Sequence, residues 1–181
     1  KKNVRNEMRI SMTENFSEII NEETASQKLL QWSGEYERPC GHKPLARSHS
    51  YGCPLNVSDG EKIKGMLSKV GYEFTSDVNE AQLILYNTCA VRENAEDKVF
   101  GKLGDLKHLK ENNPELIIGI CGCMAQQKHV AEKIKKTYRQ VDFVFGTFAY
   151  NDMYNMLWEI ISKHDRIFNL SENHVDINED F

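Results

Sequence analysis

The sequence predicts an α/β fold in which a parallel sheet is covered by helices on both faces. Short apolar runs alternate with longer segments whose apolar residues recur every three or four positions. Such alternation is typical of strand-helix-strand units, whose parallel strands are joined by right-handed crossovers. Hydrophobic residues make up 40% and charged residues 28% of the 181 positions, which is ordinary for a globular domain.

The first predicted elements lie between residues 46 and 86. A weak strand over 46–51 is followed by a helix that we expect to begin at the capping-box pattern of 58–61. Gly71 is expected to end this helix, and 72–75 and 82–86 are predicted as an edge strand and a buried strand. The apolar stripe of the helix consists of Ile63, Met66, Leu67 and Val70.

The second half repeats the same alternation and ends in a polar segment. A long amphipathic helix is predicted to end at the Asn-Asn-Pro sequence of 112–114. The predicted order is helix 92–110, strand 116–120, helix 129–138, strand 141–145, helix 151–163 and a last strand over 166–170. We therefore expect a flavodoxin-like parallel sheet.

The length of 181 residues predicts one domain with extensions. We expect an N-terminal extension over 1–44, partly irregular with short helices at 16–20 and 27–32, a domain over 45–165, and a linker over 166–181. No apolar run approaches a membrane span and no signal-peptide core is present, so we expect a cytoplasmic protein. The net charge of −4 argues against this chain alone holding a nucleic acid.

Three cysteines stand in turn-like settings just past predicted strands. Cys53, Cys89 and Cys123 follow one another at intervals of about 35 residues, the length of one strand-helix-strand unit. Because the carboxyl ends of parallel strands meet at one edge of a sheet, the three thiols are expected to converge. Three thiolates suit an iron-sulfur cluster that keeps one iron open.

Other roles for the cysteines remain open at this point. Each could be a small buried apolar residue, or a zinc site could include His49 or His129. Cys121 could form a redox dithiol with Cys123, whereas Cys40 has no evident partner. The sequence lacks both a Walker A motif and G-x-G-x-x-G, which weakens a nucleotide-binding interpretation.

The residues around the cysteines have two interpretations. Asn56, Asn87 and Thr88 are typical of turns and caps, or they could hydrogen-bond to the sulfur atoms of a cluster. Arg92, at the expected start of a helix, could add positive charge beside an anionic cluster or form a surface ion pair. Because Gly122 permits a sharp change of direction, we expect Cys121 to be buried and Cys123 alone to reach the iron.

Three segments carry a resemblance to a known family: Tyr-Gly-Cys-x-x-Asn over 51–56, Asn-Thr-Cys-Ala-Val-Arg-Glu-Asn-Ala over 87–95, and Cys-Gly-Cys-Met-Ala-Gln over 121–126. They resemble the amino-terminal domain of the radical-SAM methylthiotransferases, most closely the MiaB branch that acts on tRNA. The resemblance covers about residues 45–161. It implies that Cys53, Cys89 and Cys123 bind an auxiliary [4Fe-4S] cluster and that Cys121 is a neighbour of the cluster.

The resemblance also implies a larger enzyme. In the family, a second [4Fe-4S] cluster on a Cys-x-x-x-Cys-x-x-Cys motif cleaves S-adenosylmethionine, and the auxiliary cluster takes part in sulfur supply. The product would be a 2-methylthio group on N6-dimethylallyladenosine at position 37 of tRNA. This sequence lacks that motif, and Pro54, Leu55 and Gly60 depart from the family's usual residues.

We therefore expect an amino-terminal fragment of a tRNA methylthiotransferase that is inactive alone. It would be a monomer and would meet tRNA through carboxy-terminal domains, and the sulfur donor is not assigned. The alternative is a stand-alone iron-sulfur or metal module that stores sulfur or docks a partner.

Overall fold

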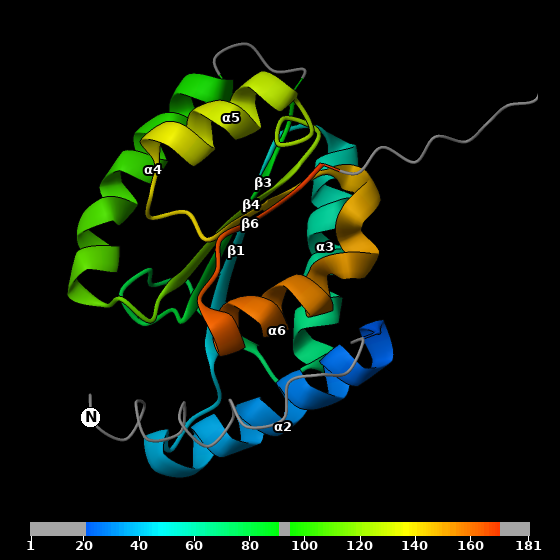
Figure 1. Ribbon diagram of the computed structural model, residues 1–181, viewed down its shortest axis with the longest axis vertical. Coiled ribbons are helices and arrows are strands. Elements are labelled where there is room, and N and C mark those ends of the chain that lie inside the picture. Colours follow the sequence, from blue (N-terminus) through cyan, green and yellow to red (C-terminus); the bar gives the residue numbers. More distant parts are fainter. Residues whose placement is uncertain (1–20, 91–94, 171–181) are drawn as a thin grey trace, which may run out of the picture.

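A six-stranded parallel sheet forms the centre of the computed structural model, which describes residues 21–90 and 95–170 (Figure 1). The strands lie in the order β2-β1-β3-β4-β5-β6, and each neighbouring pair is parallel. The first five strands follow the flavodoxin order, so the predicted fold class is confirmed. The strands are β1 Leu45–Tyr51, β2 Glu73–Phe74, β3 Leu83–Thr88, β4 Ile117–Gly122, β5 Phe143–Phe145 and β6 Ile167–Asn169.

Helices cover both faces of this sheet (Figure 1). On one side lie α4 and α5, on the other α3 and α6, and α2 packs against α6. Among the helices that the structure describes, none is long and apolar enough to cross a bilayer. The helices are α2 Glu22–Cys40, α3 Pro54–Lys69, α4 Ala95–Asn112, α5 Lys128–Thr137, the 3-10 helix η1 Thr147–Asp152 and α6 Met153–Lys163.

Strand β3 shows how the sheet separates two apolar cores. Leu83 and Leu85 pack into the core under α2, α3 and α6, whereas Ile84 and Tyr86 pack into the core under α4 and α5. Successive side chains of a strand point to opposite faces, so a strand covered on both sides is apolar throughout. This explains the continuous apolar runs in the sequence.

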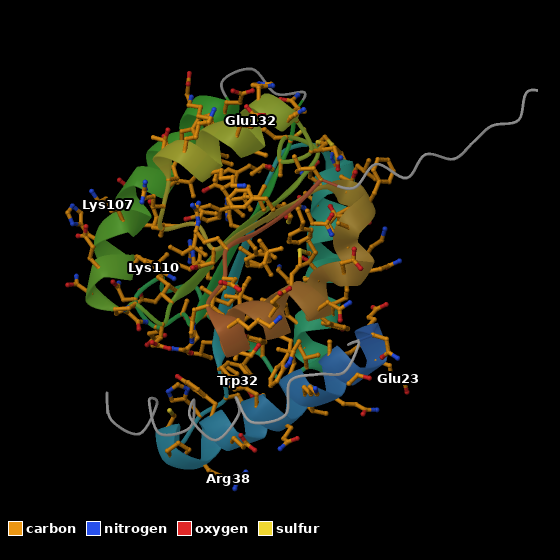
Figure 2. All side chains as sticks on the ribbon, in the orientation of Figure 1. Glu23, Trp32, Arg38, Lys107, Lys110 and Glu132 are labelled. Atoms are coloured by element: carbon orange, nitrogen blue, oxygen red, sulfur yellow. The ribbon has the colours of Figure 1, made fainter. Side chains whose placement is uncertain are left out.

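Helix α2 is longer than the short helix predicted over 27–32. The Asn21 side chain accepts a hydrogen bond from the backbone N–H of Thr24 at its start, and Gly41 ends it with a φ of 76°. The apolar spacing extends over the whole helix, which buries Leu29 at its centre. Figure 2 shows Trp32 on the side facing α6 and Arg38 pointing away. The segment 16–20 lies outside the described residues, and the domain boundaries remain a prediction.

The N-cap of helix α3 lies five residues earlier than the predicted N-cap, Ser58. Cys53 is the N-cap, with a ψ of 170°, and Pro54 occupies the first helical position. Proline suits this position because its φ is already helical and its missing N–H would have no partner there. The expected capping box over 58–61 is therefore wrong, since Ser58 lies inside the helix.

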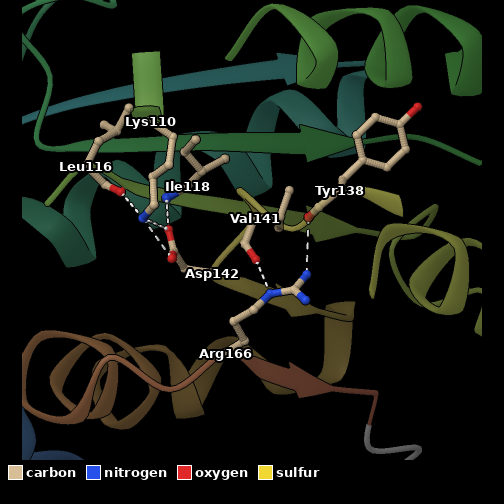
Figure 3. Close-up of polar contacts among 7 residues, drawn as sticks. All are labelled: Lys110, Leu116, Ile118, Tyr138, Val141, Asp142 and Arg166. Carbon is tan, nitrogen blue, oxygen red and sulfur yellow. Dashed lines mark hydrogen bonds and ion pairs between the residues drawn. The ribbon is translucent and has the colours of Figure 1, made fainter. Parts of the chain in front are cut away.

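A charged network fixes the amino-terminal ends of β4, β5 and β6 (Figure 3). The cysteines follow the opposite, carboxyl ends of the strands. Lys110, in the last turn of α4, lies 2.8 Å from each carboxylate oxygen of Asp142. Asp142 also accepts the N–H of Ile118 at 2.8 Å. Arg166 donates to the carbonyls of Val141 and of residue 138 at 2.7 and 3.2 Å, so the three strands are tied together where they begin.

Candidate metal centre

The three predicted cysteine ligands all lie just past the carboxyl ends of neighbouring strands. Cys53 is separated from β1 by one glycine, Cys89 directly follows β3, and Cys123 directly follows β4. Strands β1, β3 and β4 are adjacent in the sheet. In sheets of this type, ligands bind outside the carboxyl ends of the strands, where the strand order reverses between β1 and β3.

Asn56 connects two of the cysteines. The sulfur atoms of Cys53 and Cys123 lie 3.7 and 3.8 Å from its Oδ1 atom, within hydrogen-bonding distance for sulfur. The backbone N–H of Ala90 donates to the Cys123 sulfur at 3.2 Å. The loops after β1 and β4 therefore meet at the Asn56 side chain, and the loop after β3 contacts the Cys123 sulfur through Ala90.

Cys89 is the buried member of the three, whereas Cys53 and Cys123 are partly exposed. It packs against Gly52: a Cβ atom at Gly52 would lie 2.3 Å from the Cβ of Cys89 and 3.3 Å from the Cγ of Asn56. Only a residue without a side chain fits there while Cys89 keeps its position. Gly52 thus allows the loop before Cys53 to approach Cys89.

Asn87 and Thr88 are strand residues, which corrects their interpretation as turn or cap residues. Strand β3 continues through both, and their side chains are fully buried. Asn87 forms hydrogen bonds with Asn56, and the Thr88 hydroxyl donates to the carbonyl of Cys121 at 2.7 Å. These partners from other elements allow polar side chains to complete a buried strand.

Cys121 is buried in β4, as predicted, and its side chain belongs to the core beneath α3 and α6. Gly122 then has a φ of 96°, which L-residues with side chains rarely adopt. A Cβ atom there would lie 2.4 Å from the carbonyl oxygen of Thr88. The predicted change of direction at Gly122 is confirmed, and it brings Cys123 out of the sheet.

The pKa values of two neighbouring thiols, Cys121 and Cys123, are raised above their usual values. Burial raises the pKa of the Cys123 thiol, and the neighbouring Cys89 raises it further, although the Ala90 N–H opposes both effects. Burial also raises the pKa of Cys121 well above its usual value. A metal ion that binds Cys123 would therefore have to displace the proton of a thiol whose pKa is raised.

Two polar residues near the cysteines were not predicted. The hydroxyl of Tyr150, from η1, donates to Oδ2 of Asp59 on α3 at 3.4 Å. Burial and the nearby Cys121 and Asp59 raise the pKa of Tyr150. The two residues are about 90 positions apart in the sequence, so only the packing of η1 on α3 reveals the pair.

The histidines considered for zinc have other neighbours. The His49 ring lies against Tyr51, with 4.3 Å between ring centroids, and His129 lies 3.8 Å from Glu96. Cys40 is the last residue of α2. Across 21–90 and 95–170, no three His, Cys, Asp or Glu side chains are arranged so that they could hold a metal ion directly. Arg92 lies outside the described residues.

The donor set nevertheless suits a thiophilic centre. The Cys53 and Cys123 thiols lie beside the Asn56 side chain, and Cys89 packs against the neighbouring Gly52. Sulfur donors are the usual ligands of iron-sulfur clusters. The fold and the site thus define a class, a flavodoxin-like domain with a cysteine-rich edge at its topological switch point. Residues 46–146 match the family described as "Uncharacterized protein family UPF0004", and the chain belongs to this family.

Curated relatives carry the name tRNA-2-methylthio-N(6)-dimethylallyladenosine synthase. The chain is 48% identical over 121 residues to that of Clostridioides difficile, 41% over 147 residues to that of Caldicellulosiruptor saccharolyticus, and 56% over 98 residues to that of Staphylococcus haemolyticus. These alignments cover 67%, 81% and 54% of this chain, but only 25%, 31% and 19% of the relatives. The chain therefore spans about a third or less of the relatives it matches.

Proposed function

We propose that this chain is the amino-terminal iron-sulfur domain of a tRNA-2-methylthio-N6-dimethylallyladenosine synthase. The observation that carries the proposal is the meeting of three cysteine loops at one sheet edge in a chain similar to enzymes of that name. Cys53, Cys89 and Cys123 would bind a [4Fe-4S] cluster, which would provide an open iron for sulfur chemistry.

The residues of this chain would have separate tasks at that site. Cys53 and Cys123 face the partly exposed side of the edge, whereas Cys89 would anchor the cluster from the buried side. Gly52 and Gly122 provide the close approach and the turn that the ligands need. Cys121 belongs to the apolar core and would not be a ligand.

Anaerobic reconstitution with iron and sulfide tests the ligand assignment. The parent chain should bind about four iron atoms, and replacing any of Cys53, Cys89 or Cys123 with Ala should sharply lower that content. Cys40→Ala and Cys121→Ala are matched controls that should retain it. Equal iron in all variants would contradict the assignment, and a cluster lost only in Cys121→Ala would reverse the roles of the two neighbouring cysteines.

The complete reaction would need parts that this sequence does not contain. It has no Cys-x-x-x-Cys-x-x-Cys motif to bind a cluster that cleaves S-adenosylmethionine, and its net charge is −4. We therefore expect no 5′-deoxyadenosine when S-adenosylmethionine and reductant are added to the reconstituted chain. The same cysteine substitutions in a full-length relative should abolish 2-methylthio formation in tRNA. Full modification by those variants would favour a module that only stores sulfur or docks a partner.

A further inference from the structure

Cys89 and Cys123 lie side by side just past two adjacent strands. Thr88 and Gly122, the last residues of β3 and β4, are register partners, and the two cysteines directly follow them. The N–H of Met124 donates to the carbonyl of Thr88 at 3.4 Å, so the two chain segments stay in contact beyond the sheet. Adjacent strands lie about 4.8 Å apart, and the Cα atoms of cysteines joined by a disulfide lie about 4.4–6.8 Å apart. The spacing of the two segments therefore suits a disulfide.

The Cys123 side chain packs against the backbone on both sides of Cys89. Its sulfur lies 3.6 Å from the carbonyl oxygen of Thr88 and accepts the N–H of Ala90 at 3.2 Å. The Cys89 thiol is also a hydrogen-bond partner of the Cys123 thiol. The two thiols are thus in direct contact.

The other two cysteines near the site are less suitable partners for Cys123. The sulfurs of Cys53 and Cys123 lie 3.7 and 3.8 Å from the same oxygen, Oδ1 of Asn56, and within the described part of the chain no hydrogen bond joins these two sulfurs. The Cys121 thiol belongs to the apolar core beneath α3 and α6. Cys89 is therefore the preferred partner.

We propose that Cys89 and Cys123 form a disulfide when no metal is bound and a small disulfide, such as glutathione disulfide, is the oxidant. Cys123 is partly exposed and reacts first, whereas the buried Cys89 completes the bond. The Cys123 thiolate attacks one sulfur of the oxidant and releases one glutathione, and the Cys89 thiolate then attacks the Cys123 sulfur and releases the second. The two protein thiols lose their protons and a pair of electrons, and the glutathione disulfide is reduced to two glutathione molecules.

The disulfide itself is independent of the proposed function, but its consequence for metal binding rests on that function. The bond would occupy two of the three thiols assigned to the cluster. The oxidised chain should therefore lose iron binding, and a dithiol reductant should restore it. The site would then be closed to iron under oxidising conditions and open under reducing conditions.

Peptide mapping of the oxidised chain tests the proposal. The reduced, metal-free chain is incubated anaerobically with glutathione disulfide at about pH 8, because burial raises the pKa of Cys123 and only thiolates attack. Free thiols are then alkylated, and the chain is digested without reduction. We expect one main cross-link, between the peptides that contain Cys89 and Cys123, and fragment spectra should locate it at Cys123 and not at Cys121.

Cysteine variants and an unfolded chain are the controls. Cys53→Ala, Cys121→Ala and Cys40→Ala should keep the cross-link, whereas Cys89→Ala and Cys123→Ala should lose it. Oxidation in urea should remove the preference, because Cys89 is separated from Cys53 and from Cys123 by similar lengths of about 35 residues, and closing either loop then costs about the same entropy. Circular dichroism establishes which variants are folded, and the map of the parent chain needs no variant.

The outcomes separate the disulfide from the proposed function. A main cross-link that includes Cys53 or Cys121, or glutathione bound to Cys123 without a cross-link, overturns the disulfide, whatever the iron content. If Cys89 and Cys123 are cross-linked but the reduced chain binds no iron, the disulfide stands and the proposed function fails. Equal iron in the cross-linked and the reduced chain would contradict the ligand assignment, because two of the assigned thiols would then be dispensable.

Discussion

Gly122 shows how one residue connects the sheet to the candidate metal centre. It is the last residue of β4, has a φ of 96°, and leaves no space for a side chain beside Thr88 and Asn87. The preceding Cys121 is buried in the core, whereas Cys123 leaves the sheet. The different environments of two cysteines two positions apart therefore follow from the backbone conformation of the glycine between them.

We predict that Gly122→Ala lowers the free energy of unfolding by about 1–3 kcal/mol, because the left-handed conformation and the close contacts both disfavour a Cβ atom. It should also lower iron binding by displacing Cys123. Urea unfolding and iron content are the measurements. Gly104→Ala is the control, since an added Cβ at Gly104 has nothing within 4 Å. Because Gly104 lies within a helix, Gly104→Ala should raise the free energy of unfolding by up to about 1 kcal/mol. A Gly122→Ala variant as stable as the parent would contradict the strain argument.

The sequence alone predicted that the three cysteines follow neighbouring strands, but it did not predict how the two asparagines are arranged. Cys53, Cys89 and Cys123 could be selected because each follows an apolar run, and parallel strands bring such positions together. The direction in which Asn56 presents its amide depends on Asn87, which lies 31 residues away and on another element. No local pattern carries that information.

At the scale of elements, boundaries were harder to predict than the elements themselves. The predicted strand over 82–86 extends to Thr88 in the structure, because β1 and β4 on either side continue the hydrogen-bonded ladder. Helix α3 begins at Pro54 because the chain turns directly from β1 into the helix at Cys53. Both shifts depend on neighbours in space, whereas the predictions used local propensity alone.

Helix α2 is expected to contribute to the stability of the sheet domain. Leu29 is fully buried in the core beneath α6, so Leu29→Ala should lower the free energy of unfolding by about 2–4 kcal/mol. The adjacent Leu30 is 53% exposed. Leu30→Ala should therefore change the free energy of unfolding by less than about 0.5 kcal/mol. Chemical unfolding of the two variants is the comparison. Equal, small effects would indicate that α2 is not packed on the domain in solution.

Lys110 and Asp142 give the fold a pH dependence that can be measured. Burial raises the pKa of Asp142, while Lys110 opposes that shift. Removing the ammonium in Lys110→Met should raise this pKa further, so protonation of Asp142 would then favour the folded state. At about pH 7, the free energy of unfolding of Lys110→Met should be about 2 kcal/mol lower than that of the parent chain. The deficit should shrink as the pH falls through the raised pKa of Asp142, because the added stability belongs to the protonated form.

Lys107→Met is the control for this prediction. Lys107 lies on the same helix, but it is exposed and is 4.0 Å from Glu111 (Figure 2). Exposed ion pairs of this kind contribute little to stability. The free energy of unfolding of Lys107→Met should therefore differ from that of the parent by less than about 0.5 kcal/mol, both at neutral pH and at low pH. A pH-independent loss in Lys110→Met would indicate that packing of the lysine side chain, and not the charge of Asp142, is responsible.

At the scale of the whole molecule, the two apolar cores lead us to expect a fold that does not depend on a metal. Apolar cores lie on both faces of the sheet and are built from residues far from the cysteines as well as near them. We predict that a chelator removes bound iron without changing the far-ultraviolet circular dichroism of the chain. Small zinc domains behave differently, since they unfold when the metal leaves. Loss of the helical signal on chelation would show that the cluster is part of the core.

The parallel sheet also imposes an order in time. Each strand pairing joins segments separated by a crossover connection, so no two of the three cysteine loops can meet through local folding. Contacts between distant segments form late, after the entropy of closing the intervening loops has been lost. In a newly synthesised chain, the three thiols are therefore expected to remain apart until β4 has joined the sheet. If the three thiols bind a cluster, as proposed, their site is complete only after β4 has joined the sheet, so we expect the cluster to be inserted into a domain that has already folded.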